Sequence, residues 1–207
     1  MIRKTKIIAT IGPATSSKKT LKSLIEKGVT VCRLNFSHLS HEEAQKLISK
    51  IKEINQEIGS HTAILADLQG PKIRVGDFEK PIKIKKGSEI IFSTKKKKNT
   101  IQINYKNFAK DVKPKDIVLL DDGKLKLEVV STNNLDLVVL KVIFGGFLYS
   151  RKGVNLPNTT ISLPCLTKKD IKDLDFILTQ KIEWIGLSFV RKAKDVKDLK
   201  KIIKKMN

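Results

Sequence analysis

The sequence is poor in cysteine, arginine and aromatic residues, and it has no long apolar run. Its two cysteines, Cys32 and Cys165, do not form a CxxC pair, which argues against a thiolate zinc site and a structural disulfide. We expect two reduced, partly buried thiols. No apolar stretch approaches the roughly 20 residues that a membrane-spanning helix needs, and the first residues lack a secretory signal pattern. We therefore predict a cytoplasmic protein without a membrane partner.

The formal net charge of +21 raises the question of a nucleic-acid partner. Only five of the 42 basic residues are arginine, and aromatic residues make up 5% of the chain. Nucleic-acid interfaces favour arginine for bidentate contacts and aromatic rings for stacking. The four lysines at 95–98 are interpreted as a solvated hairpin tip, with a phosphate or RNA site as the alternative. Richness in lysine, isoleucine and asparagine indicates a coding bias toward A and T, so we predict no nucleic-acid partner.

The first part of the chain alternates between β-like runs and amphipathic helices. One helix is predicted to begin at Ser17, and a second at Ser40, where Glu43 completes a capping box. This alternation is typical of a parallel sheet with helices packed outside it. The predicted strands cover residues 5–12, 29–37 and 62–67.

The pattern changes to short β-like runs separated by turn residues and returns to strands and helices after Pro164. The returning part has a helix from Thr167, a strand over 183–190 and a helix over 194–206. The fold class is thus α/β, an incomplete TIM (β/α)₈ barrel with an inserted all-β barrel domain. The short runs are 82–84, 89–93, 101–103, 117–120, 124–130 and 135–142. The predicted domains are 1–74 (barrel), 75–153 (insert) and 154–207 (barrel continued).

Polar residues gather at the ends of two predicted strands. Arg33, Asn35 and Ser37 alternate, so their side chains face the same way. They would be costly inside a core, and the alternative is a strand that emerges into solvent. Asp67 ends the third strand, and a Gly-Pro turn with a lysine and an arginine follows. This mixed charge suits an anionic ligand bound with a cation, whereas the alternative is a weak surface ion-pair network.

Five segments carry a resemblance to a known family: residues 5–15, 33–38, 67–74, 152–157 and 187–191. In this order they resemble the signatures of the pyruvate kinases. The resemblance covers essentially the whole chain and includes the position of the inserted β domain. It implies phosphoryl transfer between phosphoenolpyruvate and ADP, giving pyruvate and ATP in glycolysis, by an enzyme expected to be a homotetramer.

The resemblance also implies roles for particular residues. The residues expected to bind the substrate are Arg33, Ser188 and Phe189. The expected nucleotide contacts are Asn35, Phe36, Ser37, His38, Arg74 and Lys152. The expected ligands of a monovalent cation are Asn35, Ser37, Asp67 and the carbonyl of Leu68.

The sequence departs from the family pattern at one position that is linked to potassium. Lys72 follows Gly70-Pro71 where potassium-dependent members usually carry glutamate, and a lysine ammonium can supply the positive charge itself. We therefore expect potassium to be dispensable.

The resemblance places the catalytic lysine and the acidic ligands of Mg²⁺ on strands beyond Asn207, so no catalytic residue is expected among these residues. We expect the chain alone not to turn over substrate. Three interpretations stay open: a piece of an ordinary glycolytic enzyme, a short product of a decayed gene, or a basic nucleotide- or nucleic-acid-binding protein without enzyme activity.

Overall fold

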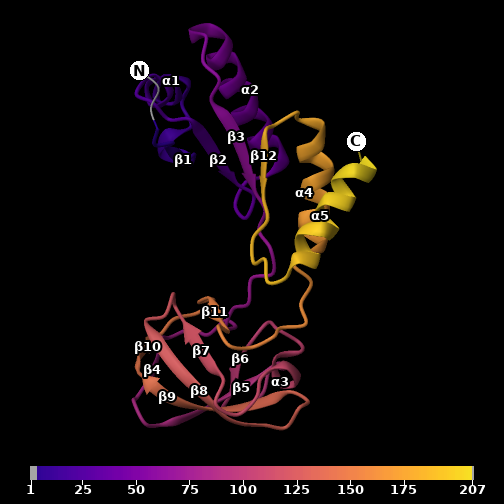
Figure 1. Ribbon diagram of the computed structural model, residues 1–207. Helices are drawn as coiled ribbons and strands as arrows, with labels where there is room; N and C mark the ends of the chain where they lie inside the picture. The colour runs from indigo at the N-terminus through magenta and orange to yellow at the C-terminus, as the bar shows by residue number, and fades with distance from the viewer. Residues whose placement is uncertain (1–3, 207) are drawn as a thin grey trace. The chain divides into compact units, whose positions relative to one another are not determined.

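The computed structural model describes residues 4–206, and the chain divides into two compact units (Figure 1). The α/β unit contains the described residues up to Pro71 and from Pro164 onward, and the β unit contains Lys72–Leu163. The β unit thus extends beyond the predicted insert, 75–153, on both sides. One reason is that β11 (Val154–Asn155) pairs with a strand of the β unit.

The α/β unit is built on four parallel strands in the order β1-β2-β3-β12. The predicted parallel arrangement is confirmed, but each strand is shorter than predicted. The strands are β1 (Ile8–Thr10), β2 (Val31–Asn35), β3 (Ala63–Asp67) and β12 (Trp184–Gly186).

Three helices of this unit begin at the predicted caps. The hydroxyl of Ser17 accepts from the amide of Thr20, and capping boxes join Ser40 to Glu43 and Thr167 to Asp170. A 3₁₀ turn, η1 (Pro13–Thr15), precedes the first helix. The helices are α1 (Lys18–Glu26), α2 (His41–Ile58), α4 (Lys168–Thr179) and α5 (Ala193–Met206). No helix in the described part of the chain is long and apolar enough to cross a membrane.

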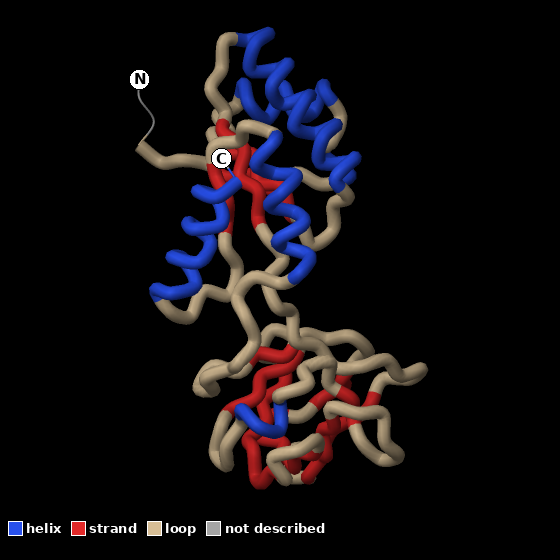
Figure 2. Tube along the Cα trace, turned by 90° about the vertical axis from the view of Figure 1, so that its right-hand side faces the viewer, coloured by secondary structure: helices blue, strands red, loops and turns tan. Residues whose placement is uncertain are grey.

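The two faces of the parallel sheet differ in polarity. Cys32, Leu34 and Ile64 are buried on one face and pack in a single core with side chains from all four helices. Figure 2 shows these helices (blue) beside the strands (red). On the other face Arg33 and Asp67 are partly exposed. Alternation along the strands thus separates the core from a polar face.

The β unit is a half-barrel whose main sheet has the strand order β11-β7-β8-β9-β5-β6, with β10 and β4 as a separate pair. The six predicted runs are present, while two further strands, β10 and β11, and a short helix, α3, were not predicted. The elements are β4 (Ile82–Ile84), β5 (Glu89–Ser93), β6 (Ile101–Gln102), α3 (Phe108–Asp111), β7 (Ile117–Leu120), β8 (Leu125–Thr132), β9 (Leu137–Phe144) and β10 (Gly146–Leu148).

The predicted hairpin at 95–98 is wrong. The flanking strands, β5 and β6, run parallel, so the lysines lie in a crossing loop instead of a hairpin tip. Lys97 pairs with Asp136 at 2.8 Å, and Lys95 lies 4.0 Å from the same carboxylate. Beneath this loop the β unit has one core, which includes Phe92, Phe108 and Leu127.

Candidate functional site

An ion-paired cluster lies at the carboxyl end of the parallel sheet. Arg33 and Asp67 come from neighbouring strands, and Nε of Arg33 donates to the Asp67 carboxylate at 2.9 Å, with a second bond from Nη2 to the same oxygen. Nη1 of Arg33 donates to the Thr10 hydroxyl at 2.8 Å. The Ser188 hydroxyl donates to the other Asp67 oxygen at 3.2 Å. Four strand ends therefore contribute to one polar cluster.

These contacts do not use all the N–H groups of the Arg33 guanidinium. A guanidinium has five N–H groups, and three of them are used in the bonds to Asp67 and Thr10. Among the described residues, the other two N–H groups have no partner, and about a third of the side chain is exposed to solvent. This geometry leaves donors for a phosphate or carboxylate oxygen.

The loop after β2 carries most of the expected nucleotide contacts. The Asn35 side chain accepts from the amide of Ser37 at 3.0 Å, and the Asn35 carbonyl accepts from the amide of His38 at 3.1 Å, which makes a tight turn. His38 is exposed, whereas the Phe36 ring is fully buried in the core. Any contact of Phe36 with a ligand would therefore involve its backbone.

The loop after β3 lies against the end of β12. Gly70 has φ of +64°, and a Cβ atom placed there would lie 2.7 Å from the Phe189 ring and 3.1 Å from Cβ of Ser188. Phe189 itself has φ of +59° and is half exposed. Non-glycine residues in this left-handed region are uncommon and concentrate at functional sites. The backbone here is shaped by a close approach that only glycine allows.

The four expected cation ligands belong to adjacent strand ends. Asn35 and Asp67 are direct neighbours in the β2–β3 register, and the Leu68 amide donates to the Gly186 carbonyl at 3.0 Å. Their oxygen atoms suit a hard cation, although both carboxylate oxygens of Asp67 already accept hydrogen bonds. For Mg²⁺ the residues do not fit. Across residues 4–206, no group of three or more His, Cys, Asp or Glu side chains could hold a metal ion.

The other expected contacts belong to the β unit. The Lys152 ammonium lies 2.8 Å from the Asp121 carboxylate. This hydrogen bond raises the pKa of Lys152 and lowers the pKa of Asp121, so the lysine stays charged. The backbone amide of Arg74 donates to Asn104 at 2.7 Å, and the carbonyl of Lys72 accepts from the same side chain at 3.2 Å.

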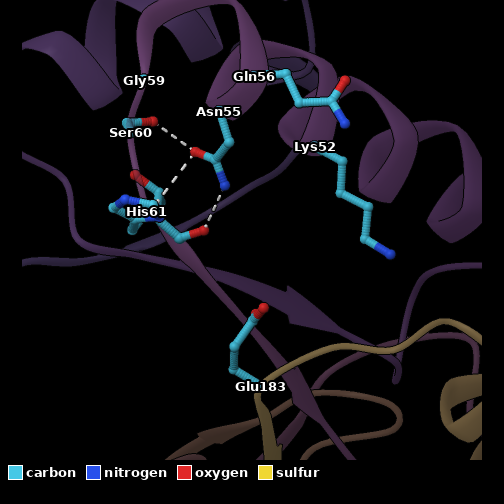
Figure 3. Close-up of a pocket in the computed structure, with 8 residues that line it drawn as sticks. Lys52, Asn55, Gln56, Gly59, Ser60, His61 and Glu183 are labelled. Atoms are coloured by element: carbon cyan, nitrogen blue, oxygen red, sulfur yellow. Dashed lines mark hydrogen bonds between the residues drawn. The ribbon is translucent and has the colours of Figure 1, made fainter.

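A hollow at the opposite end of the parallel sheet contains none of the expected residues (Figure 3). Its polar groups serve the fold. The Asn55 side chain accepts from the Ser60 hydroxyl at 2.6 Å and donates to the Thr62 carbonyl at 2.9 Å. Glu183 accepts from the Ile64 amide at 2.7 Å, and Lys52 donates to the Gln180 carbonyl at 2.6 Å. The polar cluster at the carboxyl end is therefore the stronger candidate.

Comparison with known proteins identifies the family of this chain. Residues 2–207 match the family model described as "Pyruvate kinase, barrel domain". The chain belongs to the pyruvate kinase family. Pyruvate kinase of Corynebacterium glutamicum is 42% identical over 207 residues, which cover 98% of this chain and 43% of that protein. Pyruvate kinase 2 of Synechocystis sp. is 44% identical over 209 residues, covering 97% of this chain and 35% of that protein.

A solved structure agrees with the sequence matches. The crystal structure of a pyruvate kinase from Cryptosporidium parvum superposes with a TM-score of 0.90 at 36% identity, covering 97% of this chain and 42% of that one. The resemblance and fold class predicted from the sequence are thus confirmed. The chain spans about two fifths of the length of these pyruvate kinases.

Sequence reasoning missed two residues that contact this polar cluster. Thr10 ends the first strand, and its position at the same sheet edge was the available signal. Cys165 donates from its thiol to the Ser188 carbonyl at 3.1 Å, a contact between residues that are 23 apart in the chain. Both cysteines are free and buried.

Proposed function

We propose that this chain supplies the phosphate-binding side of a pyruvate kinase site, which transfers a phosphoryl group between phosphoenolpyruvate and ADP. The observation that carries the proposal is the Arg33–Asp67–Ser188 cluster at the carboxyl end of the sheet, in a chain of this family. Carboxyl ends of parallel strands are where such folds place their ligand sites.

Each residue has a physical role in this proposal. Arg33 binds a phosphate oxygen through its remaining N–H groups, while Asp67 and Thr10 fix the plane of the guanidinium. Phosphoryl transfer depends mainly on positioning and on positive charge around the moving group. The loop from Asn35 to His38 provides polar contacts for the nucleotide phosphates. In the β unit, Lys152 and Arg74 are the basic residues to which the family resemblance gives a role in nucleotide binding. Ser188 and Phe189 line the substrate side.

We further propose that residues 1–207 alone do not turn over substrate. The catalytic lysine and the Mg²⁺ ligands that the family resemblance implies are not among these residues. Mg²⁺, when bound, would compensate the charge of the phosphates. The site assigned here binds and orients, and a coupled assay of the purified chain with phosphoenolpyruvate, ADP and Mg²⁺ should give no rate above background. Clear turnover would contradict this part.

Potassium is proposed to be dispensable for the complete enzyme. Lys72 carries a charge that can replace it, and the Asp67 carboxylate already has a cationic partner in Arg33. Activity should therefore change little when potassium is replaced by a bulky organic cation. A strong loss of activity would contradict this proposal.

The phosphate-binding role is tested with an arginine pair. Arg33→Gln should weaken the affinity of the chain for phosphoenolpyruvate at least about tenfold, because a charge-assisted bond is lost. Arg151→Gln is the matched control, since Arg151 also pairs with an aspartate, Asp77, but is exposed on the β unit. Equilibrium dialysis measures the affinity of both variants for phosphoenolpyruvate. Equal affinity of the two variants would contradict the assignment of Arg33.

A further inference from the structure

Two buried carboxylates lie on consecutive turns at the start of α4. Asp170 is 0% exposed and Asp173 is 3% exposed. Buried carboxylates are costly unless they are fully hydrogen-bonded. Both of these are bonded, and the bonds reach two different loops of the candidate site.

The first loop is the β2–α2 connection, residues 36–40. Asp173 accepts from the Lys169 ammonium at 2.6 Å and lies 2.8 Å from Nε2 of His41, the first residue of α2. The same Lys169 ammonium donates to the Phe36 carbonyl at 2.6 Å. The loop is therefore held at its first residue and just beyond its last.

Aromatic packing supports the same attachment. The His41 ring stacks on Phe176 of α4 with centroids 4.6 Å apart and an interplanar angle of 6°. The Phe36 and Phe176 rings lie 6.3 Å apart. Both ends of the loop thus contact one residue of α4, in addition to the bonds of Lys169 and Asp173.

The second loop follows β3. One carboxylate oxygen of Asp170 accepts from the amide and hydroxyl of Thr167 at 2.7 and 2.6 Å, which caps α4. The other oxygen accepts from the Gly70 amide at 3.1 Å. One side chain therefore fixes both the start of α4 and the loop that approaches Ser188 and Phe189.

We propose that Lys169, Asp170 and Asp173 are positioning residues of the site. They hold the two loops that follow β2 and β3 against α4, and they do so through two buried carboxylates and the partly exposed Lys169 ammonium instead of through contact with a ligand. The effect on ligand affinity rests on the proposed function, whereas the attachment of the loops does not. Fixed loops bind more tightly because less conformational entropy is lost on binding.

Hydrogen exchange, followed by mass spectrometry on the full 207-residue chain, tests the attachment. Lys169→Met removes the donor to the Phe36 carbonyl, and it should speed exchange of the loop amides, including His38 and Leu39, by about tenfold or more. Lys172→Met is the matched control, because Lys172 is exposed on the same helix. Lys169→Arg keeps charge and donors and should restore slow exchange. Equal exchange in the Lys169→Met and Lys172→Met variants would overturn the proposal.

Phosphoenolpyruvate binding provides the second readout. Affinity should fall several-fold in Lys169→Met and stay within about twofold in Lys172→Met. If the unaltered chain does not bind phosphoenolpyruvate, the proposed function fails, and hydrogen exchange alone still decides whether α4 holds the loops. Faster exchange with unchanged affinity would overturn the positioning role.

A further variant covers the case in which Lys169→Met does not fold because Asp173 is left charged and buried. Lys169→Met combined with Asp173→Asn removes both charges, and it should fold with a fast-exchanging loop. Asp175→Asn, at an exposed position of α4, is its control. If the double variant also fails to fold, the charges are required by the whole unit, and the specific positioning role is wrong.

Discussion

The α/β unit buries one face of its sheet under helices, whereas the β unit folds its strands around a single core. In the α/β unit the edge strands expose large apolar side chains, with Ile8 at 57% and Trp184 at 62%. The uncovered face is also where Arg33 and Asp67 form their ion pair. The comparison shows that the β unit uses its strands for one core, whereas the sheet of the α/β unit holds the core on one face and the polar cluster on the other.

The two units carry different chromophores, which lets each be followed separately. The single tryptophan, Trp184, belongs to the α/β unit, and the two tyrosines, Tyr105 and Tyr149, belong to the β unit. Tryptophan fluorescence and tyrosine absorbance therefore report on different units. Separate signals allow the stability of each unit to be measured in the same unfolding experiment.

Removing a large core side chain from the β unit should have the largest effect. Phe92 is fully buried, so Phe92→Ala should destabilise the β unit by about 3–5 kcal/mol through lost burial and a cavity. In urea, the tyrosine transition should move to lower concentration while the tryptophan transition stays in place. If both transitions move together, the two units do not unfold independently.

Two glycine substitutions test how closely the loop at Gly70 packs in the α/β unit. Gly70→Ala and Gly59→Ala both place a side chain at a left-handed φ, +64° and +62°, but only Gly70 has neighbours within 4 Å of the added Cβ. Gly70→Ala should therefore cost about 1–3 kcal/mol more than Gly59→Ala. Tryptophan-monitored urea unfolding measures the difference. Equal costs would mean that Phe189 moves away freely.

Acid should weaken the β unit through Asp136. The Lys97 hydrogen bond, together with that of Asn133, lowers the pKa of this carboxyl below its ordinary 3.8. A lowered folded-state pKa stabilises the fold above the unfolded pKa, and this contribution is lost as pH falls through the folded value. The tyrosine transition should thus shift less between pH 6 and pH 3 in Asp136→Asn than in the unaltered chain. The same shift in both proteins would contradict the role of Asp136.

Both thiols should react slowly as long as the α/β unit is folded. Both cysteines lie in the α/β unit, and burial raises the pKa of Cys32 to about 11 and also raises that of Cys165. At pH 8 a disulfide reagent should label neither thiol rapidly in the folded chain, since the thiolate is the reactive form. Labelling should follow the tryptophan transition in urea. Rapid labelling before that transition would show that the α/β unit opens locally.

Local sequence signals predicted much of the fold correctly. Ser17, Ser40 and Thr167 cap helices through contacts within three residues of the chain, so their signals are short-range. Alternation on β2 placed Arg33 and Asn35 on the polar face, away from Leu34. The prediction of a hairpin at 95–98 was wrong, because a run of lysines does not reveal whether the strands around it pair parallel or antiparallel.

The sequence by itself determined the starts of the capped helices, the α/β class and the family, because these depend on periodicity, caps and short motifs. Only the tertiary structure decided the partners of the charged groups. Arg33 meets Asp67 34 residues away, Gly70 meets Asp170 100 residues away, and Lys169 meets the Phe36 carbonyl 133 residues away. Such pairs depend on how strands and helices pack, and no local pattern encodes which distant polar group will fill a buried hydrogen-bonding position.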